Sequence, residues 1–306
     1  MEELKRVLRR AIGSPSMPQP PNLGRYRSAA PLRPRPVFDW PPIRRAPAPA
    51  IETVNPQVRF QVTAPAADIL NSLRSNGIAV VDNFMNREQT GAADIALRST
   101  FSQENCDLIP AAHGSQMILL RGRHLQASKE AHRSFAYIAG HSLIKAAGHD
   151  FFGDADWTNT SIYGLVYLDE RRGDVHYHID PSACLKALVY VTDVASESDG
   201  PFFLDVGSHR EGYYRMMTHY YEGAKRAFEI PEEEIRAPAK VLGKAGTCIL
   251  FNSILIHRAG EVARGHSRVS LTYFFDRPYA NDADMNIPPY LYSFRHQSEE
   301  RPYIQG

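Results

Sequence analysis

The feature that most constrains the fold is a series of short segments rich in β-branched and aromatic residues, which begins near Trp157 and ends near residue 278. The segments are SIYGLVYLDE, CLKALVYVTDV, GPFFLDVG, GTCILFNSI and RVSLTYFFD, and turn-forming residues separate them. This pattern is typical of β-strands. Five or more such strands in succession predict a β-barrel or β-sandwich for residues 157–278.

The preceding residues, 56–150, predict a part dominated by helices. ADILNSLRSNG, NREQTGAADIALRSTF and SKEAHRSFAYIAGHSLIKAAG carry apolar residues at helical spacing, and Gly77 is placed to end the first helix. IAVVDNF and QMILLRG predict single strands between them. Residues 208–235 interrupt the later strand series and predict a helical insert. Residues 56–306 are therefore expected to form one α+β domain with flanking helices.

Residues 1–55 differ in composition from the rest of the chain. The first 50 residues hold eleven of the 22 prolines and carry ten Lys/Arg against three Asp/Glu, whereas the remainder carries 25 against 31. A proline-rich segment lacks the amide donors that a sheet requires, so we expect an extended or disordered basic arm. This N-terminal arm is a candidate for contact with its own domain, a second subunit or another protein.

The overall composition argues against several classes of protein. The formal net charge of +1, without a basic stripe interleaved with aromatic residues, gives no reason to expect a nucleic-acid partner. No apolar run approaches the roughly 18 residues that a membrane span needs. Cys106, Cys184 and Cys248 are widely spaced, which argues against a disulfide framework and a thiolate zinc site. We therefore expect a cytoplasmic protein with no membrane partner.

The segment GDVHYHIDPSACLKALVY places His176, His178 and Asp180 at alternate positions before a predicted strand. Side chains two residues apart on a strand point to one face at a separation of about 7 Å, so their donor atoms can converge on one ion. His257, expected at the end of a later strand, is the best third ligand. Two histidines and one carboxylate leave open positions on an octahedral metal, which suits Fe(II) oxygenases.

A second group of polar residues follows His257 along the chain. Arg268 opens the alternating strand RVSLTYFF, eleven residues after His257, and shares a strand face with Ser270. A guanidinium beside a hydroxyl can bind a carboxylate through two parallel hydrogen bonds. Arg264 competes for this role but lies in a polar turn. We therefore expect Arg268 and Ser270 to bind the far carboxylate of a metal-chelating dicarboxylic acid.

With these residues the sequence resembles the phytanoyl-CoA dioxygenase-like group of Fe(II)/2-oxoglutarate oxygenases. LRSNGIAVVDNFMNREQ resembles the opening helix–strand–helix of that group, and LKALVYVTDVASESDGPFFLDVGSH resembles its stretch after the HxD motif. The likeness covers roughly residues 65–278. It implies a double-stranded β-helix, which is a jelly-roll or cupin-like core.

The resemblance also implies a reaction and a set of cofactors. Fe(II) would be bound by His178, Asp180 and His257, and 2-oxoglutarate and O₂ would be the cosubstrates. Because halogenating relatives replace the metal-binding carboxylate with a small residue, Asp180 favours hydroxylation of a small organic metabolite, with release of succinate and CO₂. Two alternatives stay open: a non-catalytic jelly-roll protein that binds a ligand, and a cupin-type metalloenzyme that does not use 2-oxoglutarate.

Four further residues are candidates for the surroundings of the metal. His176 shares the ligand face, but a fourth protein ligand would fill a position that the cosubstrates need, so we place it beside the metal or in the pocket wall. In the alternative cupin-type enzyme His176 would be a ligand. Tyr163, Lys186 and His209 are candidates for the substrate pocket, although Lys186 could equally lie on an outer strand face. These residues do not identify the substrate.

Overall fold

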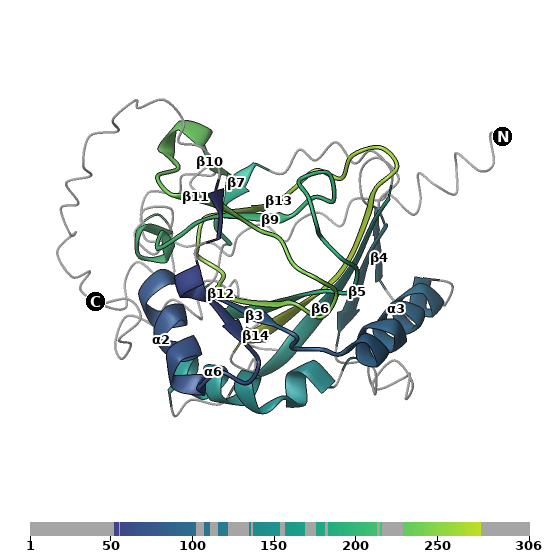
Figure 1. The fold of residues 1–306 in the computed structure, drawn as a ribbon, viewed down its shortest axis with the longest axis horizontal. Coiled ribbons are helices and arrows are strands. Elements are labelled where there is room, and N and C mark those ends of the chain that lie inside the picture. Colours follow the sequence, from purple (N-terminus) through teal and green to yellow (C-terminus); the bar gives the residue numbers. More distant parts are fainter. Residues whose placement is uncertain are drawn as a thin grey trace, which may run out of the picture.

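The structure is a computed structural model, and two β-sheets face each other in it with helices on the far side of the larger sheet (Figure 1). It describes residues 52–54, 56–101, 107–110, 116–121, 135, 137–153, 157–168, 176–180, 183–212, 215 and 229–276. Nearly all of the predicted N-terminal arm lies outside these residues. None of the helices described is long and apolar enough to cross a membrane.

The larger sheet has eight strands, and β14 lies near its middle. The order is β2 (Arg59–Gln61), β3 (Ile78–Asp82), β12 (Cys248–Asn252), β8 (Leu185–Tyr190), β14 (Ser267–Asp276), β6 (Thr158–Leu168), β5 (Gln116–Arg121) and β4 (Asp107–Pro110). All neighbours are antiparallel except β2 and β3. Its central strands are long, so they pair over many residues.

The smaller sheet has six strands of two to four residues each. The order is β1 (Glu52–Thr53), β11 (Pro238–Val241), β9 (Phe202–Asp205), β13 (His257–Ala259), β7 (Tyr177–His178) and β10 (Glu229–Ile230). A single residue pair, His257 opposite His178, joins β13 to β7. This register places two of the predicted metal ligands directly beside each other.

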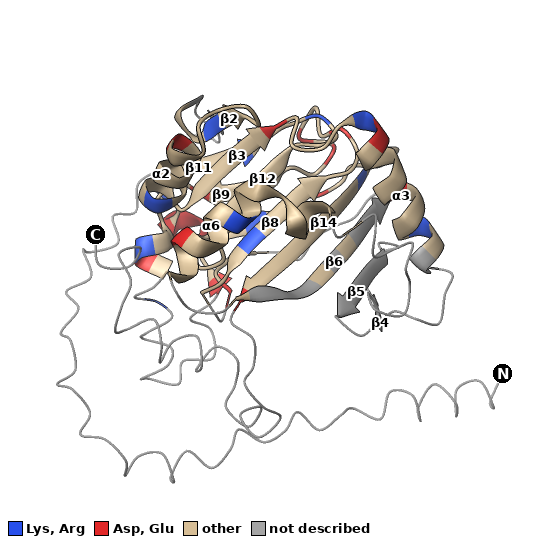
Figure 2. Cartoon of the chain, turned by 90° about the horizontal axis from the view of Figure 1, so that it is seen from below, with Lys and Arg blue, Asp and Glu red and all other residues tan. Residues whose placement is uncertain are grey.

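The alternation along β14 assigns its two faces to different surroundings. Val269, Leu271, Tyr273 and Phe275 belong to a core shared with α2 (Ala66–Asn76), α3 (Arg87–Phe101) and α6 (Ser142–Phe152). Figure 2 shows α2 and α6 across this face of the sheet. The intervening residues of β14, beginning with Arg268, point the other way, between the two sheets.

The space between the sheets holds a second apolar cluster. Leu188 and Tyr190 of β8 and Phe251 of β12 pack there against Phe202 and Leu204 of the smaller sheet. A polar residue of β8 or β14 that points in this direction is therefore enclosed by both sheets. Such residues are rare in a sandwich core unless they serve a bound group.

Several sequence predictions are confirmed by the observed elements. The five predicted β segments overlap β6, β8, β9, β12 and β14, and the two predicted single strands correspond to β3 and β5. The first two predicted helices are α2 and α3. Gly77 ends α2 with φ of 74°, and a Cβ at this position would lie 2.6 Å from Nδ1 of His209. Gly77 is therefore required both by the turn and by the packed histidine.

Two predicted elements differ from the structure. The long helix expected over residues 128–148 is interrupted, because His141 has an extended backbone and caps α6 by accepting a hydrogen bond from the Leu143 amide. The insert expected to be helical over residues 208–235 contains the strand β10 near its end. Because β10 pairs with β7, tertiary hydrogen bonds override the local helical pattern there.

Two predicted boundaries also differ. Residues Glu52–Thr53, assigned from the sequence to the N-terminal arm, form β1 and pair with β11. His257 was expected to end a strand, but it begins β13. Both strands are so short that their apolar pattern is too brief to be recognised, and their pairing partners are distant in the sequence.

Candidate metal centre

Three side chains converge at the edge of the space between the sheets. His178 lies at the end of β7, Asp180 follows two residues later, and His257 begins β13. One donor atom from each residue lies within 4.8 Å of the other two. The two imidazole rings have centroids 4.5 Å apart. The structure therefore brings together the three side chains that the sequence predicted as metal ligands.

Backbone carbonyls determine which ring nitrogen of each histidine is available. Nδ1 of His178 lies 2.9 Å from the carbonyl oxygen of His176, and Nδ1 of His257 lies 2.6 Å from that of Leu255. Because a carbonyl only accepts hydrogen bonds, each Nδ1 must carry the proton. Each Nε2 is then left with its lone pair, which is the form that binds a metal.

The environment of His257 keeps its ring neutral. Burial, together with the nearby His178, lowers the pKa of His257 to about 3. The ring lies among aromatic side chains, with centroid distances of 5.1 Å to Phe251 and 5.4 Å to Phe202. A neutral, desolvated imidazole with a fixed orientation is suited to coordinate a cation near neutral pH.

The carboxylate of Asp180 is ionised despite its burial. Burial by itself raises the pKa of this carboxyl, but neighbouring positive charge, chiefly that of the Lys186 ammonium, outweighs that effect and lowers the pKa overall. Lys186 forms an ion pair with Oδ2 of Asp180. Asp180 is thus held as an anionic oxygen donor beside two neutral nitrogen donors.

Ser253 positions the segment that carries Asp180. Its carbonyl accepts the Asp180 amide at 3.0 Å, its hydroxyl accepts the Cys184 amide at 2.8 Å, and its own amide donates to the Cys184 carbonyl at 2.9 Å. Ser253 is fully buried. The sequence motifs do not single out Ser253, because its partners Asp180 and Cys184 are distant from it in the sequence.

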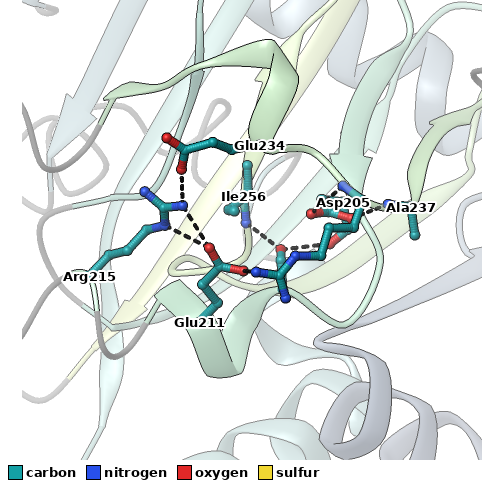
Figure 3. Close-up of polar contacts among 8 residues, drawn as sticks. Asp205, Glu211, Arg215, Glu234, Ala237 and Ile256 are labelled. Carbon is teal, nitrogen blue, oxygen red and sulfur yellow. Dashed lines mark hydrogen bonds and ion pairs between the residues drawn. The ribbon is translucent and has the colours of Figure 1, made fainter. Parts of the chain in front are cut away.

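A second polar network supports β13. The amide of Ile256, the residue before His257, donates to the hydroxyl of Ser208 at 2.9 Å, and its carbonyl accepts the Asp205 amide at 2.9 Å. The Asp205 carboxylate in turn accepts the Ala237 amide at 2.7 Å (Figure 3). These bonds connect β13 to the turn after β9 and so fix the position of His257.

The same region contains a half-buried ion-pair cluster, which Figure 3 shows beside that network. Arg215 contacts the carboxylates of Glu211 and Glu234. Glu211 lies in the helical turn after β9, and Glu234 lies in the short helix η4 (Glu232–Glu234). The cluster joins the start and the end of the insert over residues 208–235, close to the network that supports β13.

Arg268 and Ser270 lie on the face of β14 that points between the sheets. Both are buried, and Ser270 is the register partner of Tyr190. Burial raises the pKa of Tyr190 to about 12, and the positive charge of Arg268 opposes this rise, which indicates that Arg268 lies near Tyr190. Among the residues that the structure describes, the Ser270 hydroxyl has no hydrogen-bond partner. This hydroxyl is therefore available to form a hydrogen bond with a bound molecule or a water.

The other predicted pocket residues occupy different positions. His176 is exposed and contributes its backbone carbonyl to His178. His209 is buried outside the donor group, where its Nε2 lies 3.1 Å from the Arg74 carbonyl at the end of α2. The backbone of Tyr163 lies in β6 opposite Thr272, and its side chain lies outside the described part of the structure. Among the described side chains of this group, that of Lys186 contacts a predicted ligand, through its ion pair with Asp180.

Comparisons with known proteins identify the class to which this site corresponds. Residues 166–270 match the family model described as phytanoyl-CoA dioxygenase (PhyH). This range contains His178, Asp180, His257, Arg268 and Ser270, so the resemblance stated from the sequence is confirmed. A search of curated proteins finds no match.

Solved structures add likeness of fold. The epimerase SnoN from nogalamycin biosynthesis, in complex with Fe³⁺, alpha ketoglutarate and nogalamycin RO, is 16% identical with a TM-score of 0.53, covering 73% of this chain and 90% of SnoN. AviO1 from Streptomyces viridochromogenes Tue57 is 14% identical with a TM-score of 0.50, covering 72% and 98%. HygX from Streptomyces hygroscopicus, with nickel and 2-oxoglutarate bound, is 16% identical with a TM-score of 0.47, covering 69% and 86%.

The match to the PhyH family model and the group formed by His178, Asp180 and His257 indicate the same class of protein. The chain is a 2-oxoglutarate-dependent non-haem iron enzyme with oxygenase-type activity. Over residues 166–270, about a third of its length, the chain is similar to the phytanoyl-CoA dioxygenase (PhyH) family model.

Proposed function

We propose that His178, Asp180 and His257 bind Fe(II) through three ligands on one face. The observation that carries this proposal is the convergence of their donor atoms within 4.8 Å, with the Nδ1 atom of each histidine bonded to a backbone carbonyl. Two nitrogen donors and one oxygen donor suit an iron ion that keeps three positions open. His176 is exposed, which supports its assignment outside the ligand set.

Arg268 and Ser270 are proposed to bind the far carboxylate of 2-oxoglutarate. Both are buried on the inward face of β14, and the unsatisfied hydroxyl of Ser270 supports this role. A charged guanidinium and a hydroxyl give a carboxylate directional hydrogen bonds in a space that excludes water. Tyr190, whose hydroxyl donates to the Val241 carbonyl at 2.9 Å, forms part of the adjacent wall.

The strand order supports a double-stranded β-helix as the finer description of the fold. Around β14 the larger sheet runs β12-β8-β14-β6, and the smaller sheet runs β11-β9-β13-β7. Successive strands from β6 to β9 therefore alternate between the sheets, as do β11 to β14. This alternation is expected of a jelly-roll. Both ends of the site, the metal ligands and the carboxylate cradle, would then lie inside one roll.

The reaction proposed is hydroxylation of a small organic molecule, coupled to conversion of 2-oxoglutarate and O₂ to succinate and CO₂. When bound, iron supplies the oxidative chemistry. The chain orients the two cosubstrate ends through its ligands and Arg268, and it excludes water with Phe202 and Phe251 beside His257. SnoN is an epimerase in complex with nogalamycin RO, so the product has to be identified and not only the succinate.

The test is anaerobic loading with Fe(II) and 2-oxoglutarate, followed by admission of O₂. We expect an iron–2-oxoglutarate absorbance band before O₂ and succinate afterwards. His257→Ala should abolish both signals. His266→Ala is the matched control, because His266 is partly exposed, pairs with Asp199 and lies outside the donor group. No band with wild-type protein, or an unchanged band in His257→Ala, would contradict the proposal.

A further inference from the structure

Lys186 is a buried cation at the metal centre to which the proposed chemistry assigns no task. It lies on β8 and is only 6% exposed. Its β8 neighbours Leu185 and Ala187 face the helices, so its side chain points into the space between the sheets, like those of Leu188 and Tyr190. The structure therefore excludes the outer strand face that the sequence left open for this lysine.

The surroundings of the ammonium group are mostly aromatic. Nζ lies 4.3 Å from the ring centroid of Phe274 and 5.8 Å from that of Phe251. Among the residues that the structure describes, Asp180 is the carboxylate that forms an ion pair with it. The lysine thus depends on one metal ligand for its counter-charge.

Lys186 and Arg268 lie at different depths of the site. Lys186 is the register partner of Phe274, which is six residues from Arg268 along β14. At about 3.3 Å per residue, the two backbone positions are about 20 Å apart. Lys186 is level with the metal ligand Asp180, whereas Arg268 lies further along the roll. A cosubstrate that extends from the metal to Arg268 therefore leads away from Lys186.

Occupation of the metal site changes the charge balance around Lys186. Iron brings two positive charges to Asp180, the carboxylate that otherwise balances the lysine. The two charges of 2-oxoglutarate are directed to the metal and to Arg268. The buried ammonium is then left beside a cation with little compensation, and an uncompensated buried charge is costly. A negatively charged group bound at the open side of the metal would restore the balance.

We propose that Lys186 binds an oxyanion of the substrate, a carboxylate or a phosphate, beside the iron. This inference rests on the proposed function and restricts its substrate to anionic small molecules. Phe274 and Phe251 provide the apolar wall against which the rest of such a substrate packs. Lys186 is accordingly a specificity-determining residue of this site.

The test uses the anaerobic Fe(II)–2-oxoglutarate complex, in which no turnover occurs. Acetate and inorganic phosphate are titrated as probes, with acetamide as the neutral match for acetate, and the shift of the absorbance band is measured. We expect a saturable shift with at least one anion and none with acetamide. Lys186→Met should weaken anion binding about tenfold or more, because a charge-assisted hydrogen bond is lost, and Lys186→Arg should retain part of it.

Two further measurements distinguish substrate binding by Lys186 from two other roles, binding of 2-oxoglutarate and positioning of Asp180. The affinity of Lys186→Met for 2-oxoglutarate should stay within about twofold of wild type, and its metal affinity should be equal or higher because a competing cation is removed. Thermal unfolding of each variant checks that it is folded, and Lys186→Gln replaces Lys186→Met if that variant is not.

The possible results lead to distinct conclusions. Three results would overturn the role of Lys186 and leave the proposed function standing. They are weaker 2-oxoglutarate binding in Lys186→Met, displacement of 2-oxoglutarate by the anions, and an absorbance shift with anions in Lys186→Met that equals that of wild type. Lower metal affinity with an unchanged anion shift would assign Lys186 to the positioning of Asp180 and overturn it as well. Absence of the 2-oxoglutarate band in wild-type protein would overturn the proposed function itself.

Discussion

The two sheets of this protein contribute different parts of the same site. The six-stranded sheet carries His178 and His257 on β7 and β13, strands of two and three residues. The eight-stranded sheet carries Lys186, Arg268 and Ser270 on the longer strands β8 and β14. The small sheet thus provides the candidate metal ligands, and the large sheet provides the cations and the hydroxyl that face a bound molecule.

The difference shows how each sheet is stabilised. The far face of the large sheet packs its apolar residues against three helices, so its strands are held by burial of a broad surface. The three-residue strand β13 of the small sheet is also held by polar contacts, because the Ile256 amide before it donates to the Ser208 hydroxyl and the Ile256 carbonyl accepts the Asp205 amide. Stability and metal binding should therefore respond to mutations in different sheets, and four predictions examine that separation.

The largest effect is expected in the small sheet. His257→Ala should weaken metal binding by at least about 100-fold, because loss of a direct ligand exceeds the loss of an outer partner. Isothermal titration of the metal-free protein with Fe(II) or Co(II) measures this change. The unfolding midpoint of the metal-free variant should move less than that of the large-sheet variant described next. A parallel loss of stability would show that the two sheets are not separable.

Leu271→Ala in the large sheet should lower stability and leave metal affinity unchanged. Leu271 is fully buried in the core under the helices, so removal of its side chain should lower the free energy of unfolding by about 3 kcal/mol. Metal affinity should be unchanged at temperatures where the variant is folded. Ile95→Ala on α3 is the control: Ile95 is 71% exposed, and its loss should cost about 0.5 kcal/mol or less. Chemical denaturation distinguishes the two.

The buried histidine outside the donor group should affect stability through pH. Burial lowers the pKa of His209 to about 4, whereas the unfolded value is near 6.5. Below pH 6.5 the unfolded state takes up a proton that the folded state takes up only near pH 4, so stability falls as pH falls through this window. The loss should reach about 2 kcal/mol at pH 5 relative to pH 8. In His209→Gln this part of the pH dependence should disappear from denaturation curves, and an unchanged slope would contradict it.

The smallest of the four effects concerns the cosubstrate. Arg268→Met should weaken 2-oxoglutarate binding about tenfold, equivalent to about 1.4 kcal/mol, because a charge-assisted contact to the carboxylate is lost. Titration of the anaerobic Fe(II) complex measures it, and metal affinity should not change. Ser270→Ala should have a smaller effect in the same direction. If Arg268→Met instead prevented metal binding, the division of tasks between the sheets would be wrong.

Much of the large sheet was predictable from local sequence patterns. The segment RVSLTYFFD alternates over enough residues to identify β14 and its buried face. The short strands of the small sheet were not predictable in this way, and β10 lies where a helical insert was expected. A strand of two residues has too few side chains to show a period, so its existence depends on distant partners.

The candidate site divides along the same line. Local sequence patterns were enough to predict the chemical types of the donors, the His-x-Asp spacing that puts two of them on one face, and the Arg-x-Ser pair on a strand. The folded arrangement of the strands was needed to show that His257 pairs with His178, that backbone carbonyls leave both Nε2 atoms available, and that Lys186 forms an ion pair with Asp180. Spacing along a strand is a local property of the backbone, whereas the meeting of strands remote in sequence depends on the pairing and burial of the whole fold.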